Sequence, residues 1–269
     1  MLKDISLGKY IDTNSVLHRT DPRVKIVMYI VYLVAIFMIK SPAGLIAAAV
    51  VTLAQAAVAK ISPKVLWTTI LPVLPLALFI FILNLVAYKD GDVLWKWWRI
   101  TVTAEGLRLG TVMGLRLILI IISTSVLLTL TTTPLKISDA LESLFKWLKV
   151  FKVPVHEMAM MMSIALRFIP TLIEETDKIM KAQISRGADY DTGSALNRIK
   201  GYITVLIPLF VASFKHAEEL AVAMDARCYR GGEGRTKLNP LKMTGRDWAA
   251  GGILLAGAAL ILVIEFVIH

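Results

Sequence analysis

Long apolar stretches alternate with short polar segments over most of the chain. About five of these stretches are apolar enough to predict membrane-spanning helices. They are residues 24–39, 43–59, 66–88, 107–130 and 248–268. Pro72 and Pro75 predict a kink in the third span, because membrane helices tolerate proline where the freed carbonyl groups find other partners. The pattern predicts an all-α integral membrane protein.

The pattern changes after residue 131. Apolar residues from Ile137 to Phe151 recur at helical spacing with charged residues on the other side, which predicts an amphipathic helix at a membrane interface. Two longer helical patterns follow, over residues 155–185 and from about 196 to 226. Each contains one proline, Pro170 in the first and Pro208 in the second.

These patterns divide the chain into three parts. We predict an N-terminal segment with the first four spans in residues 1–131, a platform of three amphipathic or coupling helices in residues 132–246, and a last span in residues 247–269. An even number of crossings places the platform on the same side of the membrane as the N-terminus. Because both are rich in Lys and Arg, we expect both in the cytoplasm and the C-terminus outside the cell.

Composition supports a multi-pass protein of the plasma membrane. Hydrophobic residues make up 57% of the chain and charged residues only 19%, and the mean hydropathy is +0.68. The net charge of +10 matches the excess of Lys and Arg that membrane proteins carry beside their spans. We therefore expect the lipid bilayer as a partner and no nucleic acid.

Both long helical patterns end at an arginine between two small residues. An arginine near a helix C-terminus complements the helix dipole, and this explanation is sufficient for either arginine alone. The matched pair favours docking, because small neighbours let a guanidinium enter a groove and bind a carboxylate through two parallel hydrogen bonds. A chain with two matched tips suits a dimeric partner. The two tips are Ser185, Arg186 and Gly187, and Ala226, Arg227 and Cys228.

Three further features lie in the apolar regions. Gly106, Gly110 and Gly114 are four residues apart, which predicts a helix face that another helix approaches closely. The methionines at 158 and 160–162 are compatible with an ordinary core and equally with an adaptable binding surface. Arg116 within a span has a functional role, a partner in the bundle, or a lipid headgroup that its long side chain reaches by snorkelling.

Motifs of catalysis and metal binding do not support an enzyme. The chain has no P-loop, and the segment beginning at Gly231 indicates a helix stop. His156-Glu157 would begin a zinc-protease motif, but Met160 stands where the second histidine is needed. We therefore expect no catalytic residue, no metal site and no cofactor bound by this chain.

Other membrane functions require features that are sparse here. A conventional permease that translocates its own substrate would need convergent polar residues at mid-membrane, and apart from Arg116, Asn84 and a few Ser and Thr near 123–125 few occur. An intramembrane enzyme would need clustered ionisable residues, whereas Glu265 stands alone in its span. A membrane scaffold without an ATPase partner also stays open.

Two segments resemble the transmembrane coupling subunit of energy-coupling factor (ECF) vitamin transporters, the EcfT family. They are the N-terminal Leu17-His18-Arg19-x-Asp21-Pro22-Arg23-x-Lys25 and the tip Asp225-Ala226-Arg227-Cys228-Tyr229-Arg230-Gly231. The resemblance covers nearly the whole chain. The family's tips often read Ala-Arg-Gly, so Ser185 and Cys228 are mild departures that keep a small side chain.

The resemblance implies a non-catalytic subunit of an ATP-driven importer of vitamins or other micronutrients. Its two coupling helices would insert their tips into grooves of two ABC ATPase subunits, similar to EcfA and EcfA′, which bind the ATP. Its platform would hold a membrane-embedded substrate-binding S component. The residues expected to contact that component are Leu141, Leu144, Phe145, Leu148, Met158, Met161, Met162 and Ala165.

Overall fold

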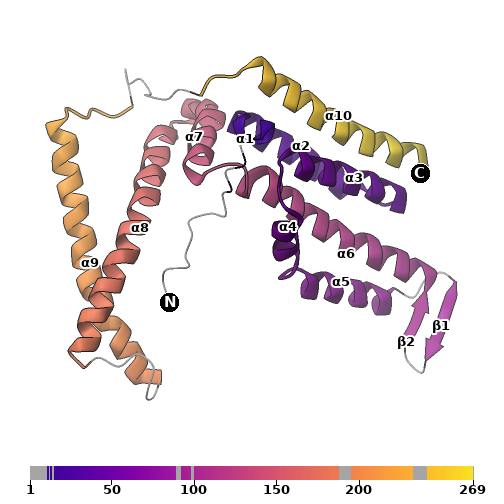
Figure 1. Ribbon diagram of the computed structural model, residues 1–269, viewed down its shortest axis with the longest axis horizontal. Coiled ribbons are helices and arrows are strands. Elements are labelled where there is room, and N and C mark those ends of the chain that lie inside the picture. Colours follow the sequence, from indigo (N-terminus) through magenta and orange to yellow (C-terminus); the bar gives the residue numbers. More distant parts are fainter. Residues whose placement is uncertain are drawn as a thin grey trace. The chain divides into compact units, whose positions relative to one another are not determined.

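The computed structural model describes Ile11, Thr13 and residues 15–88, 92–97, 100–187, 195–232 and 241–268. Within these residues the chain is helical apart from one β-hairpin (Figure 1). It divides into two compact units, which we call the membrane unit and the arm unit. The membrane unit comprises Gly8–Ala140 and Pro240–His269, and the arm unit includes Leu141–Asn239.

The membrane unit consists of helices whose starts are encoded locally. Asp21, Ser41 and Thr103 each cap a helix by accepting a hydrogen bond from a backbone N–H two or three residues further on. Its helices are α1 (Val16–Arg19), α2 (Pro22–Met38), α3 (Pro42–Val58), α4 (Pro63–Ile70), α5 (Leu74–Ala87), α6 (Ala104–Thr124) and α10 (Gly245–Ile268). A π-helical turn, Ser125–Thr129, extends α6, and α7 (Pro134–Leu144) then leads into the arm unit.

Length and composition identify the helices that can cross a bilayer. Ala104–Thr129 and Gly245–Val267 are both long and apolar enough, and α4 with α5 would make a third span bent by 55° at the predicted proline kink. Helix α3 is apolar but shorter. Together with the helical content, these lengths confirm the prediction of an all-α membrane protein, whereas the count of about five spans stays a prediction.

The core of the membrane unit lies between α2, α3, α6 and α10. Tyr32, Ile36 and Ile261 are almost completely buried there, and the Tyr32 hydroxyl donates a hydrogen bond to the Ala48 carbonyl at 2.9 Å. Many apolar side chains on the outer faces are exposed instead, and Phe266 is 89% exposed. An apolar exterior around an apolar core is what a lipid environment allows.

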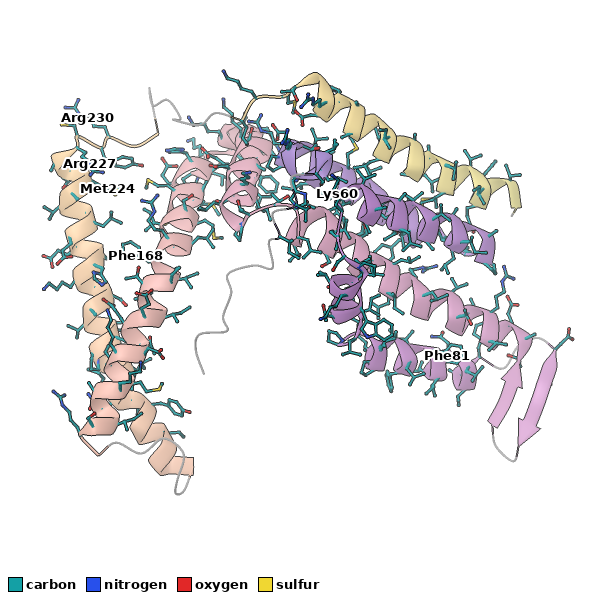
Figure 2. The ribbon with its side chains drawn as sticks, in the orientation of Figure 1. Lys60, Phe81, Phe168, Met224, Arg227 and Arg230 are labelled. Carbon is teal, nitrogen blue, oxygen red and sulfur yellow. The ribbon has the colours of Figure 1, made fainter. Side chains whose placement is uncertain are left out.

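Helices α5 and α6 are packed backbone to backbone at the three glycines. A Cβ atom at Gly110 would lie 2.9 Å from the Phe81 carbonyl oxygen, and one at Gly114 would lie 3.3 Å from that of Ala77. Phe81 is labelled on α5 in Figure 2. At Gly106 the distance would be 3.2 Å to the Tyr88 carbonyl. Because any side chain would push α5 away, glycine sets the separation of this helix pair.

Two short β-strands lie between α5 and α6 in the sequence. Strand β1 (Val93–Trp97) pairs antiparallel with β2 (Ile100–Thr103), with Val93 opposite Thr103. β-Branched and aromatic residues dominate both strands, and these residue types favour extended backbone.

The arm unit contains two long helices and a shorter segment before them. Helix α8 spans Val155–Ser185 and α9 spans Ala195–Ala226, as predicted, and both continue through their internal prolines. The amphipathic pattern from 137 to 151 is not one helix, because α7 ends at Leu144 and a 3₁₀ helix, η2 (Phe145–Phe151), follows. Lys152 then adopts the left-handed conformation with φ 60°, which ends η2, and Pro154 is the N-cap residue of α8.

Candidate functional site

The two predicted arginine tips occupy equivalent ends of α8 and α9. Arg186 follows the last residue of α8 and Arg227 follows the last residue of α9. Both arginines and their small neighbours are exposed to solvent, and Figure 2 shows Arg227 at the free end of α9. Their guanidinium groups are therefore accessible to a partner.

The backbone at the two tips follows the same hydrogen-bond pattern. The Arg186 N–H donates to the Gln183 carbonyl at 3.0 Å, and the Arg227 N–H donates to that of Met224 at 3.1 Å. The following residues also match, because the Gly187 N–H donates to the Ile184 carbonyl at 2.9 Å and the Cys228 N–H donates to the Asp225 carbonyl at 2.9 Å. The similarity seen in the sequence thus extends to the conformation of the two helix ends.

Both tips end with a residue in the left-handed region. Gly187 has φ +88° and Cys228 has φ +56°. Glycine adopts this conformation without strain, whereas a residue with a Cβ atom pays roughly 1–2 kcal/mol. The backbone at Cys228 is therefore strained, whereas the backbone at Gly187 in the equivalent position is not.

Glycine in place of Cys228 and alanine in place of Gly187 should change the free energy of unfolding in opposite directions. We expect Cys228→Gly to stabilise the arm unit by up to about 1 kcal/mol, because it removes the left-handed strain but adds chain entropy to the unfolded state. Gly187→Ala should destabilise it by about 1 kcal/mol, although no atom lies within 4 Å of the added methyl group. Chemical unfolding of the purified protein in detergent measures both, and equal signs would contradict the strain argument.

The two arms cross at a contact between equivalent residues. His216 Nε2 and Glu175 Oε1 are 2.7 Å apart, and the His216 ring stacks on Phe168 with centroids 6.0 Å apart. Glu175 and His216 are 41 positions apart in the sequence, which is also the separation of Arg186 and Arg227. Helices α8 and α9 run in opposite directions (Figure 1), and the contact joins positions that lie equally far from the two tip arginines.

The crossing determines how far apart the tips are. Each arginine lies 11 positions beyond the crossing residue of its own helix, which is about 16 Å along the helix axis at the normal rise per residue. The tips point away from the crossing in opposite directions. Their helix ends are therefore separated by up to about 33 Å.

The crossing should depend on pH. The hydrogen bond to Glu175 raises the pKa of His216 above its usual 6.5, and the charges of Glu175 and Glu219 act in the same direction. The stabilisation is then complete below about pH 6.5 and is lost as the pH rises through the higher folded value. We expect the melting temperature of the arm unit to fall over that range, and His216→Gln should remove this part of the pH profile. If the melting temperature of His216→Gln depended on pH as it does in the native chain, this explanation would be wrong.

The segment after the second tip is held against the start of α8, which sequence reasoning missed. A Cβ atom at Gly232 would lie 2.4 Å from His156 Cδ2, so only glycine fits the observed approach. His156 Nδ1 lies 2.8 Å from Glu142 Oε1 on α7. His156 therefore positions the chain beyond Arg227 and has a use unrelated to the incomplete zinc motif. No periodicity in the sequence indicates this contact, because its partners are 76 positions apart.

The residues predicted to contact a membrane partner differ in exposure. Leu144 and Leu148 are partly buried, and the others are exposed, namely Leu141, Phe145, Met158, Met161, Met162 and Ala165. A second apolar stripe lies on α9 and was not predicted. Its members are four residues apart and so share one helix face. They are Tyr202, Leu206, Phe210 and Phe214, all exposed.

Two of the charged residues within the predicted spans, Arg116 and Glu265, form hydrogen bonds near the turn between α2 and α3. Arg116 Nη2 donates to the Ile39 carbonyl. Glu265 accepts hydrogen bonds from the backbone N–H groups of Lys40 at 2.8 Å and Ser41 at 3.1 Å. These contacts explain both charges as supports of the helix bundle. Among the described residues, no group of three His, Cys, Asp or Glu is placed to hold a metal ion.

A mainly helical membrane unit joined to a pair of long, exposed helices defines a helical membrane protein. The family model for cobalt transport proteins (CbiQ) matches residues 13–238. The chain is 45% identical over 267 residues to the energy-coupling factor transporter transmembrane protein EcfT of Ruminiclostridium cellulolyticum, with 99% of each chain covered. It is 48% identical over 258 residues to the EcfT of Acidaminococcus fermentans, with 95% of each covered.

A third relative is the EcfT of Bacillus subtilis, 41% identical over 261 residues, with 97% of this chain and 98% of that protein covered. The chain therefore belongs to the CbiQ/EcfT family of membrane transport proteins. This finding confirms the resemblance inferred from the N-terminal segment and the second tip. The three relatives are named as transmembrane proteins of a transporter and not as enzymes.

Proposed function

We propose that this chain is the non-catalytic coupling subunit of an ATP-driven ECF-type importer for a vitamin or another micronutrient. The observation that carries the proposal is the pair of exposed arginine tips related by the Glu175–His216 crossing. Two sites with the same backbone pattern, equally far from the crossing, suit a partner with two similar subunits. Family membership supports the transport role.

Each tip would dock on one ABC ATPase subunit in the cytoplasm. The arginine offers a planar set of donors that binds a carboxylate through two parallel hydrogen bonds. Its small neighbours leave space for the wall of a groove. Movement of the two ATPase subunits relative to each other would then act on the two ends of a crossed helix pair, with ATP bound by the partners and by no residue of this chain.

The apolar surfaces of the arm unit would hold the membrane-embedded S component. Met158, Met161 and Met162 on α8 and the stripe that includes Phe210 and Phe214 on α9 are exposed, and unbranched methionine side chains adapt to different partner surfaces. Leaving such large apolar side chains in water is unfavourable by roughly 1.5–3 kcal/mol each. Burial against an apolar partner would recover part of that free energy.

Purification of the affinity-tagged chain from its native membrane tests the proposal. We expect two ATPase subunits and one S component to copurify with the chain in the absence of nucleotide. Arg186→Glu and Arg227→Glu tested singly should each reduce the amount of ATPase by about half, since each removes one of two sites. Isolation of the chain without ATPase subunits, together with substrate binding by the chain alone, would contradict the proposal and would favour a conventional permease.

A further inference from the structure

The 3₁₀ helix η2 places basic and apolar side chains on separate edges. In a 3₁₀ helix, residues three positions apart lie directly above one another. Lys146 and Lys149 therefore form one edge, and Lys152 follows where the helix ends, with its N–H donating to the Lys149 carbonyl at 3.0 Å. All three lysines are exposed.

The other two edges of η2 carry exposed apolar side chains, with Trp147 and Val150 on one edge and Phe151 on the other, above Leu148. Trp147 is 61% exposed, Val150 is 83% exposed and Phe151 is 69% exposed. The rings of Trp147 and Phe151 meet edge to face with centroids 6.1 Å apart, so they form one surface. Trp147 and Val150 lie on a different edge from Phe145 and Leu148, which were assigned above to the S component, and Phe151 lies at the end of that second edge.

We propose that η2 docks on an anionic lipid bilayer, with Trp147, Val150 and Phe151 in the headgroup region and the three lysines on lipid phosphates. Charge complementarity supports this partner, because residues 145–153 contain three lysines and no acidic residue. Tryptophan beside lysine is typical of membrane interfaces. Each lysine near an anionic surface contributes about a fivefold gain in binding.

The position of η2 along the chain also favours the bilayer. It begins 16 residues after Thr129, where the apolar helix that starts at Ala104 ends. Helix α7 lies between them and spans only about 16 Å, which keeps η2 within reach of the membrane surface. The inference does not depend on which proteins bind the arginine tips.

A spin label on η2 tests the proposal directly. We would replace Cys228 by serine, label Val150→Cys with a nitroxide, and reconstitute the full chain into vesicles of phosphatidylcholine alone or with about one third phosphatidylglycerol. Power saturation then compares access of oxygen, which partitions into lipid, with access of a water-soluble nickel complex. We expect phosphatidylglycerol to shift the label from nickel access to oxygen access. Lys146→Gln, Lys149→Gln and Lys152→Gln together should abolish the shift.

A matched variant separates this local effect from loss of charge in general. Lys178→Gln, Lys181→Gln and Lys215→Gln remove the same charge from exposed positions on the arms and should leave the shift intact. About 0.5 M salt should weaken the shift in the chain that retains all its lysines, because screening reduces contact with lipid phosphates. Three results would overturn the proposal: equal oxygen access without anionic lipid, equal loss in the control variant, or exclusion of both reagents, which would mean that protein covers η2.

Discussion

Replacement of both Arg186 and Arg227 by glutamate is expected to abolish uptake and to release the ATPase subunits during purification. Removal of one member of a buried, hydrogen-bonded charge pair costs about 2–5 kcal/mol, which corresponds to a loss of affinity from about 30-fold to several thousandfold at each tip. Reversal of the charge adds repulsion between carboxylates. Copurification and substrate uptake by membrane vesicles measure the two effects.

The control for this variant must change the charge equally without touching the tips. Lys178→Glu with Lys215→Glu makes the same change at exposed positions of α8 and α9, and we expect it to retain both ATPase subunits and most of the uptake. If the double arginine variant transported normally with its ATPase subunits attached, the docking role would be wrong. Equal loss in both variants would assign the effect to net charge.

The ends of the two arms could be predicted from the sequence, because helix termination is local. A small residue, an arginine and another small residue after a long apolar pattern locate the end of α8 at Ser185 and that of α9 at Ala226. The crossing of the arms could not be predicted. Glu175 and His216 are ordinary polar residues on their helices, and their contact depends on the packing of two distant segments.

In the membrane unit, local signals again predicted more than long-range ones. Pro72 and Pro75 correctly indicated a bend, which the structure places between α4 and α5. The 3₁₀ conformation of η2 was missed, because its apolar spacing fits an α-helix equally well over so few turns. The hydrogen bonds of Glu265 could not be predicted from the sequence, because their donors lie more than 200 positions away.

Removal of the Glu265 carboxylate should destabilise the membrane unit strongly. It accepts hydrogen bonds from the N–H groups of Lys40 and Ser41 and, at 2.6 Å, from the Ser41 hydroxyl. These contacts join α10 to the start of α3, where a negative charge also complements the helix dipole. Glu265→Ala leaves buried donors unpaired at about 1–3 kcal/mol each, so we expect a loss of several kcal/mol in detergent unfolding experiments.

Graded substitutions at the same contact distinguish hydrogen bonding from charge. Glu265→Gln keeps one carbonyl acceptor but loses the charge that interacts with Arg116, so its loss of stability should lie between those of the native chain and Glu265→Ala. Gly44→Ala should also destabilise the unit, because a Cβ atom there would lie 2.5 Å from Glu265 Oε2 and displace the carboxylate. Phe266→Ala changes the adjacent, exposed side chain and should have little effect. If Phe266→Ala were as damaging as Glu265→Ala, loss of apolar surface from α10 would explain both, and the carboxylate would have no special role.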